Sequence, residues 1–396
     1  MASSARRLLI ETTVIGQAFA AVLFLRFFLP AGGWEDVTGH PIGRDFLNVW
    51  GAPRVVAEHG AAALADLARY PLLLEQQFGQ TLKMFFNWSY PPHALIVLAP
   101  FSWAPYGVAL GLWTLGGLGA FAFVVRAGLP AERRRVAIAA AVLSPAAFWC
   151  VATGQNGLLL GALVLGAVLC LDRRPVVAGV LIGLLTIKPQ LGLLIPVALI
   201  AAGAWRTIFA AAATALALAL CALALYGLEP WRLWLTTTAG YQFALLTDIV
   251  AFHRYMMVSI AASGGIAGLP PVLIWPLQGL GAALAAVAVW TTFRRTDDPA
   301  TRALVLSIGA ALATPYAFNY DLTAMTGATI WLLSRRGELG PWERRVFGLM
   351  LLSPVAIVPL HMIGAPIAPL ILLAGLWIVT PRRAVPAAEP LSAAQP

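Results

Sequence analysis

The sequence predicts an all-α, polytopic membrane protein, and three observations lead to this fold class. The share of hydrophobic residues is 60% over 396 positions. Only 11% of the residues are charged, against about 25% in a typical soluble protein. Apolar stretches long enough to cross a bilayer, about 17–25 residues, recur along the whole chain. We therefore expect one membrane domain over residues 1–383 and a disordered cytoplasmic tail over 384–396.

About ten helices are expected to span the membrane. The first follows Arg6 and Arg7; it is too long for a signal-peptide core and should be retained. A further apolar stretch, 175–203, is interrupted at Lys188-Pro189, where proline cannot continue a helix. The expected spans are 8–29, 106–126, 134–152, 154–171, 206–227, 271–293, 300–316, 318–334, 345–360 and 363–380.

The distribution of basic residues predicts the topology, because cytoplasmic loops of membrane proteins are enriched in Lys and Arg. With the N-terminus in the cytoplasm, both termini are cytoplasmic and 18 of the 26 basic residues fall in cytoplasmic loops. These are Arg6, Arg7, Arg126, Arg133, Arg134, Arg135, Arg173, Arg174, Arg206, Arg294, Arg295, Arg302, Arg335, Arg336, Arg344, Arg345, Arg382 and Arg383.

This topology requires residues 175–203 to enter and leave the membrane on the same side. Two short helices meeting at Lys188-Pro189-Gln190 would satisfy it, and a kinked full span is the alternative. Irregular backbone at membrane depth is tolerated where it is buried in protein or lines a cavity. The tip at Lys188 is therefore expected to face an interior cavity.

Two long external loops, about 30–105 and 228–270, contain many aromatic residues. Trp and Tyr concentrate at membrane interfaces, so we expect interfacial helices there rather than disorder. Residues 93–105 are too short to cross the bilayer and are expected to form a short helix at the external surface.

Ionisable residues in a membrane protein are candidates for function because their burial is costly. Asp45 is followed by Phe46 and Trp50, and partial desolvation there would raise its proton affinity, as a general base requires. Capping of the following helix is the alternative for Asp45. Lys188, at the helix break, needs an anionic partner. A phosphate is one candidate, and an ion pair with Asp45 or Asp321 is the other.

Other polar residues on the external side have weaker signals. Arg44, His253 and Arg254 are candidates for phosphate binding, although the last two can equally be surface residues. Helix capping is an equal alternative for Gln155-Asn156 and the favoured one for Asn319-Tyr320-Asp321. Candidates for substrate contact are Trp50, Tyr90, Gln155, Asn156, Gln190, Tyr320 and Asp321.

Several classes of protein are disfavoured. The net charge of +9 is spread between apolar segments rather than clustered as in nucleic-acid-binding proteins. The sequence has no phosphate loop with Lys-Ser/Thr and no Gly-x-Ser-x-Gly elbow. Cys150, Cys170 and Cys221 lack the spacing of metal ligands, and no metal or other cofactor is expected.

These motifs together resemble glycosyltransferase family 87. The likeness spans about residues 40–325. It rests on Asp45-Phe46 with Trp50, Gly60 and Asp66-Leu67, on Tyr90-Pro91-Pro92, on Gly154-Gln155-Asn156, on Lys188-Pro189-Gln190, and on Pro315 before Tyr320-Asp321.

The resemblance implies a GT-C-type fold and an inverting transfer of a sugar, mannose-like, from a polyprenyl phosphate to a lipid or glycan acceptor. Asp45 would be the catalytic base, on the external face of a bacterial inner membrane. Trp50 stands where many relatives carry Tyr. A transporter or lipid flippase is the alternative; it would be expected to show inverted repeats, which the sequence lacks. A non-catalytic assembly subunit is a third possibility.

Overall fold

The computed structural model describes residues 3–247 and 252–381, so the expected tail 384–396 lies outside the described residues. Almost all regular structure is helical. The elements are α1 (Ser4–Phe24), β1 (Pro30–Gly32), β2 (Glu35–Asp36), α2 (Phe46–His59), α3 (Arg69–Phe78), α4 (Ala94–Leu98), α5 (Tyr106–Ala127), α6 (Arg134–Val142), α7 (Pro145–Thr153), α8 (Gly157–Cys170), α9 (Pro175–Leu184), α10 (Ile195–Ala201), α11 (Trp205–Tyr226), α12 (Glu229–Leu233), α13 (Ala239–Thr247), α14 (His253–Met256), α15 (Ile260–Ile266), α16 (Pro271–Arg295), α17 (Pro299–Ala313), α18 (Thr323–Arg335), α19 (Pro341–Met362) and α20 (Ala368–Val379).

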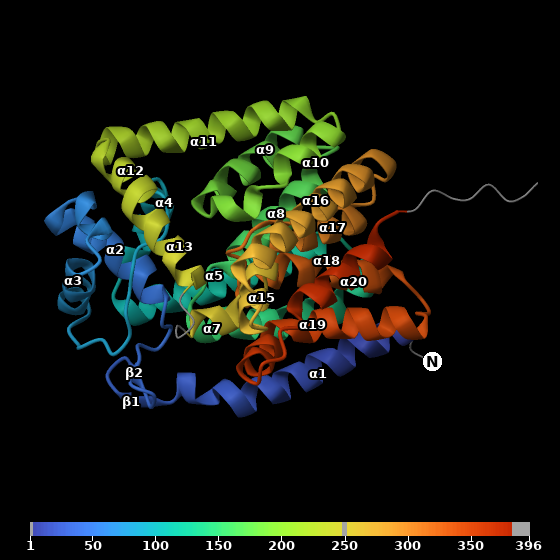
Figure 1. Ribbon diagram of the computed structural model, residues 1–396, viewed down its shortest axis with the longest axis horizontal. Helices are drawn as coiled ribbons and strands as arrows, with labels where there is room; N and C mark the ends of the chain where they lie inside the picture. The colour runs from blue at the N-terminus through green and yellow to red at the C-terminus, as the bar shows by residue number, and fades with distance from the viewer. Residues whose placement is uncertain (1–2, 248–251, 382–396) are drawn as a thin grey trace, which may run out of the picture.

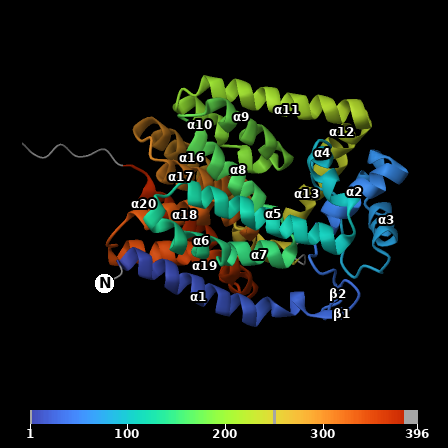
Figure 2. The same ribbon diagram turned by 180° about the vertical axis from the view of Figure 1, so that it is seen from behind.

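The long helices form a bundle with two different ends. In Figure 1, α1 and α19 run along the lower edge and α11 runs along the upper edge. The N-terminus lies at one end, near the start of α19 and the end of α20. The hairpin β1–β2 and helices α2, α3 and α12 lie at the other end, and the reverse view in Figure 2 agrees.

The number of membrane crossings is not confirmed as ten. Among the described residues, five helices are long and apolar enough to cross a bilayer: α1 with its continuation to Phe28, α5, α11, α16 and α19. A sixth crossing is possible if residues 131–153, bent by 43° between α6 and α7, form one broken span. The other expected spans are helices of 12–15 residues, namely α8, α17, α18 and α20.

Burial differs strongly between the short apolar helices and the long ones. Every residue of α18 from Thr323 to Leu333 is buried inside the protein. In α11, by contrast, only 6% of the apolar window is buried. A helix that is apolar on all sides is suited either to lipid or to a protein core. Hydropathy does not distinguish these environments, so short core helices resemble spans in the sequence.

The expected break in residues 175–203 is confirmed. Helix α9 continues through a 3-10 turn to Ile187, and a second helical segment begins at Pro189 and ends at Ala201. The end of α10 leads directly into α11, which packs along α9. In both ribbon views α9 and α10 lie together beneath α11, as expected for two halves that meet at an internal tip.

Residues from loops predicted to be cytoplasmic lie together at the end that carries the N-terminus. Arg302 pairs with Asp172 at 3.2 Å and with Asp297 at 2.5 Å. Arg335 pairs with Asp298 at 2.6 Å and donates to the carbonyl of Gly128 at 2.7 Å. These contacts join four separate loops. The structure therefore places these basic loops on one side of the bundle, which is consistent with the predicted topology.

The opposite end is formed by the two long loops, which fold into short helices. The expected surface helix at 93–105 is present as α4 and the 3-10 segment Ala99–Trp103, packed against α2. The antiparallel pair β1–β2 was not expected in an all-α chain. It forms where Gly33, with a positive φ of 55°, allows a tight reversal shortly after the first helix.

The close packing of α9 on α11 gives a testable prediction. A Cβ at Gly179 would lie 2.7 Å from the Thr207 carbonyl oxygen and 2.8 Å from the Ala211 nitrogen. Such close approach of helices through small residues is common in membranes. We expect Gly179→Ala to destabilise the protein by about 1–3 kcal/mol, because the backbones must separate.

Thermal unfolding in detergent measures this change. Gly111→Ala in α5 is the matched control, since nothing lies within 4 Å of its added Cβ. Equal melting temperatures for the two variants would contradict the prediction.

Candidate active site

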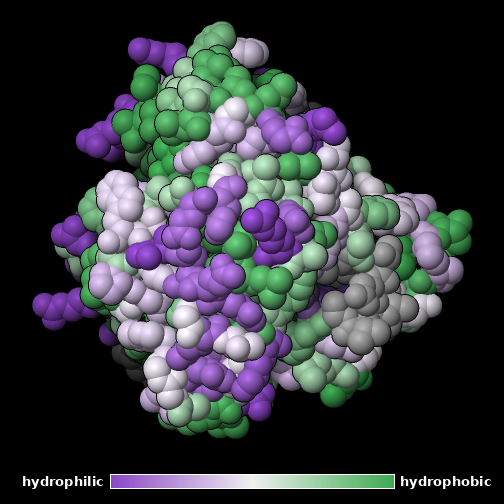
Figure 3. Space-filling model, turned by 90° about the vertical axis from the view of Figure 1, so that its left-hand side faces the viewer, coloured by the Kyte–Doolittle hydropathy of each residue, from purple (hydrophilic) through white to green (hydrophobic). Residues whose placement is uncertain are grey.

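A cavity of about 520 Å³ lies at the end of the bundle formed by the long loops. Figure 3 views this end and shows hydrophilic residues gathered over the centre of the face. The cavity is lined by Arg26, Phe27, Thr38, His40, Arg44, Asp45, Asn48, Met84, Asn87, Ser89, Tyr90, Trp149, Thr153, Gln155, Ile187, Lys188, Gln190, Gln242, Phe252, His253, Met256, Phe318 and Tyr320.

A tight turn before α2 places Asp45 in this cavity. Arg44 has a positive φ of 39°, which is strained for a residue with a side chain. The backbone N–H of Asp45 donates to the carbonyl of Thr153 at 3.0 Å and so ties the turn to the end of α7. Gly154 makes this contact possible, because a Cβ there would lie 2.1 Å from the carbonyl oxygen of Gly43. The sequence motif around Asp45 and the motif around Gln155 therefore pack directly against each other.

The Asp45 side chain does not cap α2 and is held by Gln155 instead. Asp45 occupies the N-cap position without a capping hydrogen bond, and its carboxylate accepts from Gln155 Nε2 at 2.7 Å. Burial raises the pKa of Asp45, while the charges of His253, Arg44 and Lys188 and the hydrogen bond from Gln155 act in the opposite direction. A carboxylate with raised proton affinity, fixed by one neutral donor, is suited to accept a proton.

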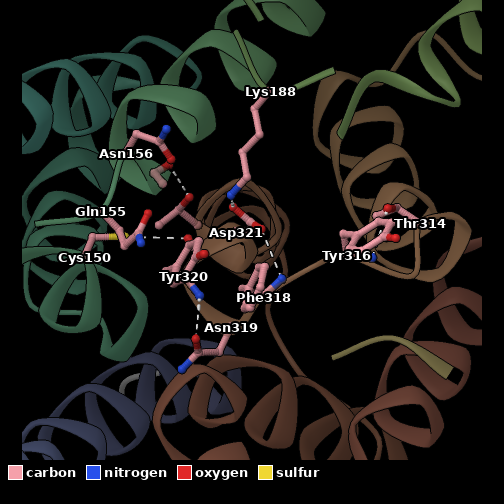
Figure 4. A network of polar contacts seen from close by, with 12 residues as sticks. Cys150, Gln155, Asn156, Lys188, Thr314, Tyr316, Phe318, Asn319, Tyr320 and Asp321 are labelled. Atoms are coloured by element: carbon pink, nitrogen blue, oxygen red, sulfur yellow. Dashed lines mark hydrogen bonds and ion pairs between the residues drawn. The ribbon is translucent and has the colours of Figure 1, made fainter. Parts of the chain in front are cut away.

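Lys188 lies at the helix break and is paired with Asp321. Figure 4 shows its side chain extending from the break toward Asp321, beside Tyr320. The Nζ–Oδ1 distance is 2.5 Å, and the two side chains are 6% and 1% exposed. The other carboxylate oxygen of Asp321 accepts from the backbone N–H of Phe318 at 3.0 Å. The ion pair considered from the sequence is therefore present, and Lys188 still lines the cavity.

Three further predicted residues line the cavity, and one supports it from behind. Tyr90, Gln190 and Tyr320 are lining residues. Asn156 is buried behind them and donates to the Tyr90 hydroxyl at 3.0 Å without capping α8. Asn156 therefore positions Tyr90 rather than lining the cavity.

The structure places Trp50 and Arg254 apart from the cavity. Trp50 is buried, donates from Nε1 to the carbonyl of Ala104 at 2.9 Å and packs edge-on against Tyr106. Arg254 is also buried, with its guanidinium against Gly265 of α15. His253, the neighbour of Arg254, does line the cavity.

Arg44 has an anionic partner of its own. Its Nη2 pairs with Asp36 at 2.8 Å, and its guanidinium lies 3.7 Å from the ring centre of Phe27. Asp36 is fully buried and also accepts from the backbone of Thr38 at 2.7 Å. Arg44 thus anchors the segment between β2 and α2 while contributing positive charge near Asp45.

Several lining residues were not identified from the sequence. Arg26 could have been predicted as a candidate, because it is a charged residue near the end of the first expected span. His40, Asn87, Ser89 and Gln242 come from the long loops, whose folding the sequence does not specify. Within residues 3–247 and 252–381 there is no group of three His, Cys, Asp or Glu side chains that could hold a metal ion.

The fold and the site define a class of protein: a helical membrane protein with a cavity at one end, in which a half-buried carboxylate lies near cationic groups. The sequence matches glycosyltransferase family 87 over residues 88–315, more than half of the chain. The chain therefore belongs to glycosyltransferase family 87 and is a glycosyltransferase. Neither a curated protein nor a solved structure matches it. Asp45 and Asp321 lie outside the matched residues, so their roles rest on geometry.

The Lys188–Asp321 pair gives a second testable prediction. We expect Lys188→Met to destabilise the protein by about 3–5 kcal/mol, because it leaves a buried carboxylate without its cation. The double variant Lys188→Met, Asp321→Asn is expected to recover most of this loss, since the amide still accepts from Phe318. Thermal unfolding of both variants in detergent measures the effect.

Lys83, the other lysine of the sequence, provides the control. It pairs with Glu35 at 2.9 Å but is 63% exposed, so Lys83→Met should cost about 0–1 kcal/mol. A similar small cost for Lys188→Met would show that the buried pair does not stabilise the fold.

Proposed function

We propose that this glycosyltransferase moves a hexose or pentose from a polyprenyl phosphate to a lipid or glycan acceptor, with inversion at the anomeric carbon. A mannose-like hexose is the favoured sugar. The observation that carries the proposal is the position of Asp45. Its carboxylate is held by Gln155 in a cavity that also contains Lys188 and His253. A general base and cations for a leaving phosphate are the two requirements of such a transfer.

In the proposed reaction, Asp45 accepts the proton of an acceptor hydroxyl. The hydroxyl oxygen forms a bond to the anomeric carbon as the bond from that carbon to the phosphate oxygen breaks. The electron pair of the broken bond leaves with the polyprenyl phosphate, and direct displacement inverts the centre. The ammonium of Lys188 has three N–H donors, of which Asp321 takes one, so two remain for the phosphate.

The two sides of the cavity suit the two substrates. Lys188, Gln190 and Phe318 come from the helix break and the segment before α18, next to the membrane helices, where a lipid-linked donor would lie. Asn87, Ser89 and Gln242 come from the long loops and offer hydroxyl and amide groups to a sugar acceptor. Tyr90, held by Asn156, is suited to stack on a sugar ring.

We further propose that the cavity lies on the external side of a bacterial inner membrane and that both termini are cytoplasmic. The grouping of the basic loops at the opposite end supports this orientation. Nucleotide sugars are confined to the cytoplasm, so a lipid-linked donor is the reasonable source of sugar at this site.

The catalytic role of Asp45 is tested by substitution. We expect Asp45→Asn to lower the rate of transfer by about 10²–10⁴-fold, because an amide accepts no proton. The assay supplies purified protein with a panel of polyprenyl-phosphate sugars and a membrane-lipid extract, and measures released polyprenyl phosphate.

Glu58→Gln is the matched control, since Glu58 is an exposed carboxylate of the same loop, bonded to Gln77. Release that requires the acceptor extract and Asp45 supports the proposal. If folded protein releases no polyprenyl phosphate from any donor, the proposed transfer is wrong and a transport function becomes the better hypothesis.

The hydrogen bond from Gln155 predicts a change in pH dependence. The base must be ionised, so activity falls as the pH drops through its pKa. The Gln155 hydrogen bond stabilises the ionised form and lowers the pKa of Asp45. Gln155→Leu should therefore raise that pKa and move the acidic limb of kcat/KM to higher pH.

A pH profile of released polyprenyl phosphate measures the shift. Gln77→Leu is the control, because Gln77 bonds to Glu58 away from the cavity. An acidic limb that stays in place in Gln155→Leu would mean that Gln155 does not set the proton affinity of the base.

A further inference from the structure

A second cavity, of about 920 Å³, lies far from Asp45, between α1, α19 and α20. Its walls are apolar along most of their length. Leu8 and Ile15 of α1, Leu349 of α19, and Leu370 and Ala374 of α20 all line it. Ile15, Leu349 and Leu370 are 56%, 46% and 65% exposed, so this surface is an open groove on the outside of the bundle.

The groove has a polar end at the start of α19. Arg344 and Arg345 line it there, together with Trp342 and Glu11. Arg344 pairs with Glu11 at 2.7 Å, so the charges of these two side chains balance. Arg345 is exposed and has no hydrogen-bond or ion-pair partner within the part of the chain that the structure describes. One positive charge is therefore left at the end of an apolar groove.

This polar end lies on the side of the bundle where the basic loops gather. The start of α19 is close to the chain's N-terminus in Figure 1. Gly337, just before α19, accepts a hydrogen bond from the backbone of Ala5 at 3.3 Å, and Arg6 and Arg7 follow on α1. Trp342 is 57% exposed, as is common for tryptophan at the level of lipid headgroups.

We propose that this groove binds an anionic phospholipid, with its phosphate at Arg345 and an acyl chain along α19 and α20. Basic pockets between membrane helices on the cytoplasmic side favour anionic headgroups. The apolar walls require a hydrocarbon ligand, which excludes a free phosphate ion. The unbalanced charge of Arg345 favours an amphiphile with a net negative headgroup over a zwitterionic lipid, whose phosphate charge is balanced by its own cation.

Native mass spectrometry of the purified full-length protein tests the proposal. The probes are dioleoylphosphatidylglycerol and dioleoylphosphatidylcholine, offered in equal amounts. We expect the anionic lipid to be retained preferentially, and Arg345→Gln to reduce its retention about fivefold, as one basic residue near a headgroup predicts. Arg345→Lys should keep the preference, since the charge is retained. Ala374→Phe, which fills the groove, should reduce retention of the anionic lipid.

Arg206→Gln is the matched control, because Arg206 is an exposed arginine at the start of α11 and does not line the groove. An equal loss in Arg206→Gln would overturn the proposal in favour of general surface charge. Equal retention of both lipids, or a dimer that forms through this groove and is lost in Ala374→Phe, would also overturn it. The readout is a bound mass and not a rate, so the result is independent of the proposed transfer.

Discussion

The rest of the structure depends on how a lysine is accommodated at a break in a helix inside the bundle. An unpaired ammonium buried to this extent would be strongly unfavourable, and its attraction to one carboxylate offsets the loss of hydration only with good geometry. Asp321 provides that geometry, because one oxygen meets Lys188 and the other meets the backbone of Phe318. This interaction joins the segment 175–203 to the 3-10 turn Asn319–Leu322 before α18 (Figure 4).

The pair also places a charged residue, Lys188, at the wall of the cavity that contains Asp45. Broken backbone at membrane depth must line a cavity or be buried in protein, and the break at Lys188 does line the cavity that contains Asp45. Arg44 and Lys188, which line the same cavity as Asp45, each belong to a charge pair. Arg44 is neutralised by buried Asp36, and Lys188 by Asp321. Asp45 has a neutral hydrogen-bond partner, Gln155. Its carboxylate is therefore not committed to an ion pair with either cation.

The sequence predicted the all-α membrane fold, whereas its count of about ten crossings is not confirmed by the lengths of the helices. Residues 318–334 were expected to form a span, yet α18 has 13 residues and is surrounded by protein. At 1.5 Å per residue it is about 20 Å long, less than the roughly 30 Å of a bilayer core. A high hydropathy indicates that a segment avoids water. It is equally high for a helix that faces lipid and for one that is buried in a protein core. Proline chemistry was more informative, since the break at Lys188-Pro189 lies where the sequence placed it.

For the candidate site, too, some features were predictable from the sequence and others were not. Local chemistry made Asp45, Lys188 and Gln155 candidates, with helix capping or an ion pair as the alternative, because a charge or amide in an apolar context needs a partner in any fold. The sequence by itself determined the membrane class, the helix break and the separation of basic loops, since each depends on composition or on neighbouring residues. Only the tertiary structure decided that Lys188 pairs with Asp321, that Trp50 packs in the core and that Arg26, Asn87 and Gln242 reach the cavity. These outcomes depend on contacts between segments that are far apart in the sequence. Ser89 and Gln242, for example, are 153 positions apart, and no local pattern encodes their hydrogen bond.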